Sequence, residues 1–471
     1  MEKKNTWETY SSKQLKELEK INAQYREFLD HGKTERECID TIVNTIEKSG
    51  YRELESLIKE GASLKTGDKV YSVWMNKSIA MFQIGRKPMT DGMNILGAHI
   101  DSPRLDVKQN PLYEDGGFAY LDTHYYGGVK KYQWVTIPLA IHGVIVKKDG
   151  TCVEINIGEN EDDPVFFVSD LLIHLAQEQL EKKAAKVIEG EALDIIVGNK
   201  PLLIDKKKEK DEKHAGKEAV KAGVLDILKE NYDIHEEDFV SAELEIVPAG
   251  KAREAGFDRS MILAYGQDDR VCAYTSMQAM LDSDVTERTM CCILVDKEEI
   301  GSVGATGMQS HFFENAVAEV MNLAGEYSEL NVRRCLSHSC MLSSDVSSAF
   351  DPTYASSFDK KNVAYLGGGM VINKFTGSRG KSGSNDANAE YLAHLRHIFD
   401  KAEVNFQTAE LGKVDLGGGG TIAYILALYG MNVIDSGVAV LNMHAPWEAT
   451  SKADVYETYR GYKAFVEGAS L

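Results

Sequence analysis

The stretch TMCCILVDKEEIGS, residues 289–302, decides the fold class of this 471-residue chain. It opens with an apolar run, in which Cys291 and Cys292 are expected to be core residues, and two adjacent glutamates, Glu298 and Glu299, follow the run. A short apolar run that ends in polar residues is typical of a buried strand in an α/β sheet. In open sheets of this kind, ligands bind beyond the carboxyl ends of the strands.

Similar patterns occur in three other parts of the chain. They are NILGAHIDSPRLDVK (94–108), CMLSSDVSSAFDP (340–352) and GVAVLNMHAPWE (437–448), which place His99, Asp101, Asp345 and His444 after apolar runs. A fifth polar cluster, residues 267–270, precedes a run with helical spacing at 271–280. Its aspartates, Asp268 and Asp269, either join the other clusters or simply cap that helix. We expect the strands to deliver their polar residues to one crevice.

The pattern of apolar and polar residues changes twice along the chain. The first sixty residues predict helices on the outside of a domain, and residues 70–80 and 93–100 predict strands. From Leu244 onward strands alternate with helices, which is typical of an α/β sheet. Residues 106–243 instead carry short alternating apolar runs, and the charged stretch DKKKEKDEK (205–213) predicts a solvated loop. The simplest architecture is one α/β domain, formed by residues 1–104 and 245–471, interrupted by an inserted domain at 105–244.

Composition excludes several classes of partner. The chain has 53 basic and 73 acidic residues, a formal charge of −20, which argues against nucleic acid and against anionic membrane surfaces. No apolar run is long enough to span a bilayer, and the N-terminus does not resemble a signal or transit peptide. Seven cysteines without C-x-x-C spacing predict neither a disulfide framework nor a zinc ribbon. A cytoplasmic protein with reduced thiols is expected.

The five clusters contain the residue types that a catalytic metal site needs. Imidazole and carboxylate donors without cysteine suit zinc, manganese or cobalt. Two histidines and three carboxylates exceed the needs of one catalytic zinc and suit two ions that share one carboxylate. Asp101 can accept the second N–H of His99 and fix its tautomer. Of the pair Glu298 and Glu299, one is expected to bind metal and the other to take a proton from water. Taken singly, each cluster also fits an ordinary surface, turn or capping role.

Taken together, these motifs resemble the aspartyl aminopeptidase / aminopeptidase I family of zinc metallopeptidases over essentially the whole chain. The resemblance rests on five segments in the family's order: H-x-D-S-P at His99–Pro103, the aspartate of Gln267–Arg270, E-E-x-G-S at Glu298–Ser302, S-x-D at Ser343–Asp345, and M-H at Met443–His444. It implies an α/β/α catalytic domain with a mixed central sheet and an inserted, mostly β dimerisation domain at 105–244.

The resemblance also implies a role for each site residue. One metal would be held by His99, Asp268 and Asp345, and the other by Asp268, Glu299 and His444, so that Asp268 bridges two ions, expected to be zinc. Asp269 is the alternative bridge, and Asp268 is preferred because its spacing to Gln278 and Ala279 resembles the family pattern. Asp101 would orient His99, and Glu298 would act as general base and then general acid. The implied activity is removal of the N-terminal residue of a peptide by a hydroxide shared between the two metals.

Three further positions resemble the family's substrate-binding residues. His174 would reach a neighbouring subunit's active site, Lys374 would pair with an acidic P1 side chain, and the glycine run 417–420, including Gly419, would let backbone approach the substrate. An ordinary helix histidine and a flexible turn are the respective alternatives for His174 and the glycine run. The family's assembly, a dodecamer built from dimers, would admit only peptides or unfolded chain ends.

The chain departs from better-known members at Ser348 and Asp351, where histidines are expected, and after His444. These departures leave the P1 preference open between acidic and neutral or apolar residues. Two other hypotheses remain at this stage: another two-metal hydrolase, such as a carboxypeptidase or N-acyl deacylase, and a non-catalytic protein that kept the fold. The complete set of ligand positions argues against the second.

Overall fold

The computed structural model describes residues 5–202 and 218–470, so the charged stretch at 205–213 lies outside the described residues. The chain divides into two compact units. Unit 1 comprises Met1–Ser102, Ala252–Met443 and Trp447–Leu471, and unit 2 comprises Pro103–Lys251 and His444–Pro446.

Unit 1 is built on a nine-stranded mixed sheet. In sheet order its strands are β1 (Arg52–Glu53), β2 (Lys69–Trp74), β3 (Ser78–Gln83), β13 (Thr289–Val295), β4 (Met93–His99), β14 (Cys340–Ser344), β18 (Asn432–Gly437), β16 (Met370–Asn373) and β17 (Phe406–Thr408). The central strands β13, β4, β14 and β18 run parallel to one another. Strand β13 is buried along its whole length, as expected for a strand covered on both faces.

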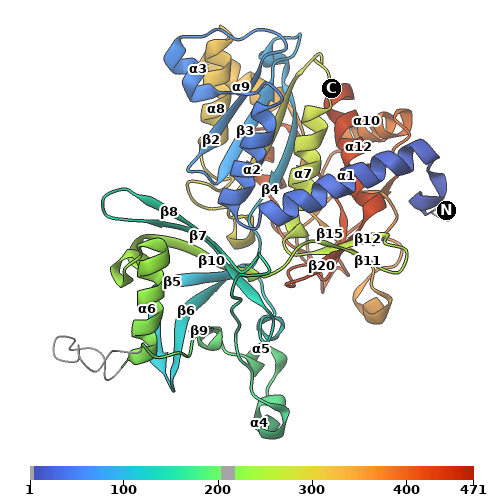
Figure 1. Ribbon diagram of the computed structural model, residues 1–471. Coiled ribbons are helices and arrows are strands. Elements are labelled where there is room, and N and C mark those ends of the chain that lie inside the picture. The colour runs from blue at the N-terminus through green and yellow to red at the C-terminus, as the bar shows by residue number, and fades with distance from the viewer. Residues whose placement is uncertain (1–4, 203–217, 471) are drawn as a thin grey trace. The chain divides into compact units, whose positions relative to one another are not determined.

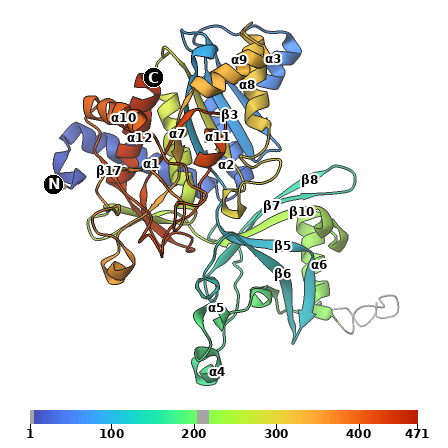
Figure 2. The ribbon, with the colours of Figure 1, turned by 180° about the vertical axis from the view of Figure 1, so that it is seen from behind.

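Helices cover both faces of this sheet, which makes the α/β/α layering of the predicted fold class (Figure 1 and, from behind, Figure 2). Leu96 and Ala98 of β4 belong to one core cluster, and Met93 and Ile95 of the same strand belong to the other, because successive side chains point to opposite faces. One face is covered by α1 (Ser12–His31), α2 (Glu35–Glu47), α7 (Gln267–Leu281), α10 (Ala389–Lys401) and α12 (Lys452–Gly468). The other face is covered by α3 (Leu54–Glu60), α8 (Phe312–Leu323), α9 (Glu329–His338) and α11 (Ala423–Ala427).

Local signals in the sequence account for the starts of two of these helices. Ser11 and Gln14 form a reciprocal capping box before α1, and Thr34 and Glu37 form another before α2. One prediction was wrong: residues 70–80 are not one strand but parts of the hairpin β2–β3. Met75 and Asn76 adopt positive φ values of 50° and 53° in its turn.

Unit 1 also contains a five-stranded sheet and several short helices. The sheet comprises β11 (Arg253–Ala255), β12 (Met261–Ala264), β20 (Glu448–Ser451), β19 (Ala439–Leu441) and β15 (Ser347–Ser348). The 3-10 helices are η1 (Thr6–Thr9), η2 (Met89–Asp91), η7 (Glu298–Ile300) and η8 (Pro352–Ser357). Helix η7 directly follows β13 and carries both glutamates of the opening motif.

Unit 2 is an all-antiparallel, six-stranded sheet, in agreement with the predicted mostly β insertion. Its strands in order are β8 (Cys152–Ile157), β7 (Leu139–Val146), β10 (Ala242–Pro248), β5 (Arg104–Asp115), β6 (Phe118–Tyr126) and β9 (Ile195–Gly198). Its helices are α4 (Gln177–Leu180), α5 (Ala184–Val187), α6 (Ala219–Tyr232), η3 (Lys131–Gln133), η4 (Ile173–Leu175), η5 (Gly190–Ala192) and η6 (Glu236–Ser241).

Two expectations from composition can be compared with the structure. Cys291 and Cys292 are fully buried, as predicted, and no disulfide joins any of the seven cysteines, all of which are described. Among the helices of the described ranges, none combines the length and the apolar character needed to cross a bilayer.

Candidate metal centre

His99 is the last residue of β4 and lies at the carboxyl end of the central parallel strands. Its side chain is almost fully buried. Its Nε2 atom lies 3.3 Å from Oδ1 of Asp268 and 4.0 Å from both Oδ1 of Asp345 and Oε2 of Glu298. Three carboxylates from three other segments of unit 1 therefore converge on one imidazole nitrogen.

Asp101 contacts both His99 and the two glutamates. Nδ1 of His99 lies 3.0 Å from the carbonyl oxygen of Asp101 and 3.2 Å from its Oδ1. A carbonyl oxygen only accepts, so in the neutral ring Nδ1 carries the proton and Nε2 presents its lone pair to the carboxylates. The backbone N–H groups of Glu298 and Glu299 donate to Oδ1 and Oδ2 of Asp101, at 3.2 and 3.1 Å. One buried carboxylate thus connects the two motifs.

Asp268 is held by contacts to its backbone rather than by a place in a regular helix. Asp268 and Asp269 have non-helical dihedral angles at the start of α7, and the peptide bond between them is cis. The regular helical backbone of α7 follows after Asp269. Ser102 Oγ donates to the Asp268 carbonyl at 2.6 Å, and the Asp268 N–H donates to Oε2 of Glu448 at 3.0 Å.

The other two carboxylate segments follow β13 and β14, the two strands that flank β4. Glu298 and Glu299 begin η7 after Lys297, which adopts a left-handed φ of 71°. Asp345 follows β14, and its N–H donates to the Ser436 carbonyl of β18 at 3.0 Å. The sharp turn after β13 brings both glutamates back over the end of the sheet, where His99 and Asp345 lie.

Within unit 1 the ligand atoms form compact groups. His99, Asp268 and Asp345 each offer an atom within 4.8 Å of the other two, and so do His99, Glu298 and Glu299. Asp268 and Glu299 are also within 4.8 Å of each other. Asp269 belongs to none of these groups.

The electrostatics of this cluster favour a cation. Burial raises the pKa of Asp345 well above its ordinary value, and the negative charges of Glu298 and Asp268 raise it further. Burial opposes protonation of His99, but the nearby carboxylates of Asp101 and Asp268 raise its pKa overall. Nε2 of His99 is buried and makes no hydrogen bond of regular geometry within the described residues. A divalent ion would satisfy both this nitrogen and the crowded carboxylates, so the donor set fits a metal.

His444 belongs to the three-residue segment that groups with unit 2. Its Nδ1 lies 3.0 Å from the carbonyl oxygen of Gly128 in the same unit. In the neutral ring this contact places the proton on Nδ1 and the lone pair on Nε2, the form in which histidine binds metals. A Cβ on Gly128 would lie 3.3 Å from the His444 ring, so glycine suits this close approach.

The three predicted substrate-binding residues lie in different parts of the fold. His174 is exposed in η4 of unit 2, and Lys374 is exposed directly after β16 of unit 1. Gly419 is exposed, and its carbonyl accepts from the N–H of Gly377 at 2.9 Å. The neighbouring Gly418, with φ of 120°, has no room for a Cβ, which would lie 2.1 Å from the Gly377 oxygen. The substrate roles of these residues stay predictions.

Sequence reasoning missed Glu448. This residue is 1% exposed and fixes the backbone of Asp268. It ends the segment 437–448, in which the sequence pattern assigns a metal-binding role to His444 alone. An acidic residue at the start of a short strand gives no local sign that its partner lies 180 positions earlier.

Comparison with known proteins agrees with this geometry. A sequence model of the family described as "Aminopeptidase I zinc metalloprotease (M18)" matches residues 28–466. The chain is 63% identical over 465 residues to a protein of Clostridium acetobutylicum named "Probable M18 family aminopeptidase 1", covering 99% of this chain and 98% of that one. A Thermotoga maritima protein of the same name is 44% identical over 468 residues, covering 99% of both chains.

Solved structures show the same relationship. The crystal structure of an M18 aminopeptidase from Thermotoga maritima covers 100% of both chains with a TM-score of 0.92 and 44% identity. The crystal structure of aminopeptidase I from Clostridium acetobutylicum covers 99% of both chains with a TM-score of 0.90 and 61% identity. Fold and site together define a metal-dependent peptidase. The chain belongs to the M18 family and is a metallo-aminopeptidase.

Proposed function

We propose that this aminopeptidase works with two divalent metal ions, expected to be zinc, with manganese or cobalt as alternatives. The observation that carries the proposal is the convergence of His99, Asp268 and Asp345 within 4.8 Å at the ends of the strands. These three residues would hold one ion. Asp268, Glu299 and His444 would hold the other, and Asp268 would be shared. The nearness of Asp268 to Glu299 supports the shared role, and Asp269 lies outside the groups.

Bound divalent ions would make a water more acidic and polarise the scissile carbonyl. Glu298 is the general base in this proposal: it takes the proton from water and delivers it to the leaving amine. Its side chain is 15% exposed, and its Oε2 lies 4.0 Å from Nε2 of His99, so the carboxylate faces the site. Asp101 is a positioning residue, because it fixes the His99 ring and the backbone of Glu298.

The free α-amine of the substrate would bind near the carboxylates, which limits cleavage to the N-terminal residue. Lys374, as a cation, would favour an acidic P1 side chain, whereas the family resemblance also admits neutral or apolar residues. Gly419 would contact the substrate backbone. His174 would act in a neighbouring subunit's site.

We also propose that residues 105–244 form a dimerisation domain and that dimers build a larger homo-oligomer acting on peptides in the cytoplasm. A relative from S. cerevisiae, 19% identical, is described as a dodecamer, and this supports a large assembly. The absence of disulfides among the seven cysteines is compatible with a reducing compartment.

The test is hydrolysis of a panel of aminoacyl substrates, with and without an N-acetyl block, at defined zinc, manganese or cobalt concentrations. We expect metal-dependent cleavage of free-amine substrates only, and a reduction by Glu298→Gln of about two orders of magnitude or more. Glu329→Gln, an exposed glutamate on α9, is the matched control and should match wild type. Equal cleavage of acetylated substrates would contradict the aminopeptidase mechanism, and full activity of Glu298→Gln would remove Glu298 as the base. The ranking of acidic against apolar residues would settle the P1 preference.

A further inference from the structure

The outer edge of the nine-stranded sheet is only partly covered. Strand β1 pairs with β2 at Val70 and Tyr71, and the chain then leaves the edge to form α3. Strand β2 continues to Trp74 and pairs along its whole length with β3 on its inner side. Beyond Tyr71, no described strand pairs with the outer side of β2. Open strand edges offer backbone groups that can pair with another chain.

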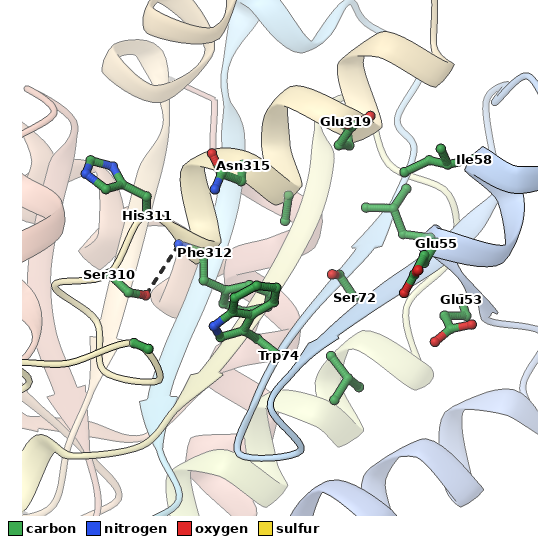
Figure 3. A pocket seen from close by; sticks show the side chains of 14 residues that line it. Glu53, Glu55, Ile58, Ser72, Trp74, Ser310, His311, Phe312, Asn315 and Glu319 are labelled. Carbon is green, nitrogen blue, oxygen red and sulfur yellow. Dashed lines mark hydrogen bonds between the residues drawn. The ribbon is translucent and has the colours of Figure 1, made fainter.

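A groove of about 410 Å³ lies along this open edge. Residues 72–74 of β2 line one side, α3 contributes Ile58, and α8 contributes Phe312. Figure 3 shows the Trp74 ring beside Phe312, and the two ring centroids are 6.3 Å apart with planes at 21°. Trp74 is 44% exposed and Ile58 39% exposed. The groove therefore presents apolar surface to solvent next to a strand edge with which no described strand pairs beyond Tyr71.

The rim of the groove is acidic. Glu53 and Glu55 lie at the start of α3, and Glu319 lies on α8 (Figure 3). All three are exposed, and the described residues that line the groove include no Lys or Arg. Glu55 pairs with Lys59 at 2.9 Å, but both side chains are about 70% exposed, so solvent screens this pair. The local potential complements a basic partner and repels an acidic one.

The side-chain alternation of β2 indicates what would fit. Val70 belongs to the core cluster under α3 and α8, so Ser72 and Trp74, two and four residues further on, point to the same face. An added strand beside β2 would likewise direct every second side chain toward Ile58 and Phe312. Those positions suit apolar residues, and a flanking Lys or Arg would reach the glutamates.

We propose that this groove docks an extended segment of a partner protein, carrying apolar side chains at alternate positions and flanking basic residues, by strand addition to β2. Main-chain hydrogen bonds to the edge of β2 would supply affinity. The apolar side chains of Ile58, Trp74 and Phe312 and the acidic rim would supply specificity. This surface belongs to unit 1 and is separate from the metal ligands. The proposal does not depend on the catalytic mechanism given above.

The test uses an acetylated, amidated hexapeptide with lysine at both ends and valine at the second and fourth positions. The acetyl group keeps it from being an aminopeptidase substrate. Two matched peptides are compared with it: one with glutamate in place of lysine, and one with alternate amides N-methylated so that it cannot pair with a strand. Binding to the full chain is measured by calorimetry at low and high salt.

We expect the basic peptide to bind at least tenfold more tightly than either matched peptide, and high salt to weaken it. Trp74→Ala should weaken binding about tenfold or more, and Glu319→Gln about two- to fivefold. Glu329→Gln, outside the groove, should leave binding unchanged. Unaltered hydrolysis rates and melting temperatures would show that the variants are folded.

Equal affinity for the three peptides, or an unchanged affinity of Trp74→Ala, would overturn the proposal. It would also be overturned if the basic peptide failed to bind while Trp74→Ala lowered the assembly mass in sedimentation. A second copy of this chain, rather than a basic partner, would then occupy the groove.

Discussion

Replacing Asp101 with asparagine tests the geometry of the site most directly. The carboxylate of Asp101 accepts from two backbone N–H groups, those of Glu298 and Glu299, and lies 3.2 Å from Nδ1 of His99. Asparagine keeps one acceptor oxygen and places an NH₂ group where the second oxygen accepts. At least one N–H therefore loses its partner and meets another donor.

The size of the effect follows from the bond that is lost. A hydrogen bond to a charged group contributes about 1.5–3 kcal/mol. If the transition state depends on the positions of Glu298 and His99, the loss corresponds to a roughly 10- to 100-fold lower kcat/KM, because about 1.4 kcal/mol is tenfold. Metal affinity should fall by a comparable factor, since His99 is no longer held in one orientation.

The assay is steady-state hydrolysis of a free-amine substrate across a metal titration, which separates kcat/KM from metal affinity. Asp91→Asn, at an exposed position in η2, is the matched control and should behave as wild type. If Asp101→Asn changed both quantities by less than about twofold while Glu298→Gln abolished activity, the positioning role assigned to Asp101 would be refuted.

Three further predictions concern stability. Gly266→Ala should destabilise the protein by at least about 2 kcal/mol in chemical unfolding, because Gly266 has φ of 70° and a Cβ there would lie 1.8 Å from Nη1 of the buried Arg270. Phe313→Ala, at a position of α8 that is 1% exposed, should cost about 3–5 kcal/mol in the same measurement, and a loss below about 1 kcal/mol would contradict the packing. Burial raises the pKa of Asp435 from 3.8 to about 7, so the folded state holds the Asp435 proton more tightly than the unfolded state does. The contribution of Asp435 to the free energy of unfolding therefore falls as pH rises from about 4 through about 7. Asp435→Asn should flatten that decline in urea unfolding at pH 5 and pH 8, and an unchanged slope would refute the assignment.

The parts of the fold that the sequence predicts are those with strong local patterns. The apolar run of β13 is buried along its whole length and ends at Val295, three residues before Glu298, as the opening motif indicates. The hairpin β2–β3 is harder to predict from the sequence, because its turn contains no Gly or Pro and because Ser78, which follows the turn, is buried. A turn held by Met75 and Asn76 in the left-handed region gives only a weak signal.

The conformation of Asp268 could not be derived from its own neighbourhood. Helical spacing after it predicts an ordinary helix start, yet its backbone is non-helical. The contacts that hold it come from Ser102, 166 positions earlier, and Glu448, 180 positions later. Such contacts exist only after the sheet has formed, so local propensity does not encode them.

The order and register of the central sheet explain why distant motifs meet. Strands β13, β4 and β14 are neighbours and parallel, so their carboxyl ends share one edge. Val295 of β13 pairs with His99, so Glu298 lies three residues beyond the position opposite His99. Ser343 of β14 pairs with Gly97, so Asp345, two residues further on, lies level with His99. A slip of one residue in either pairing would exchange the side chains of the strand between the two buried faces of the sheet and move a carboxylate by about 3.3 Å. The core packing that fixes the register therefore also fixes the spacing of the ligands.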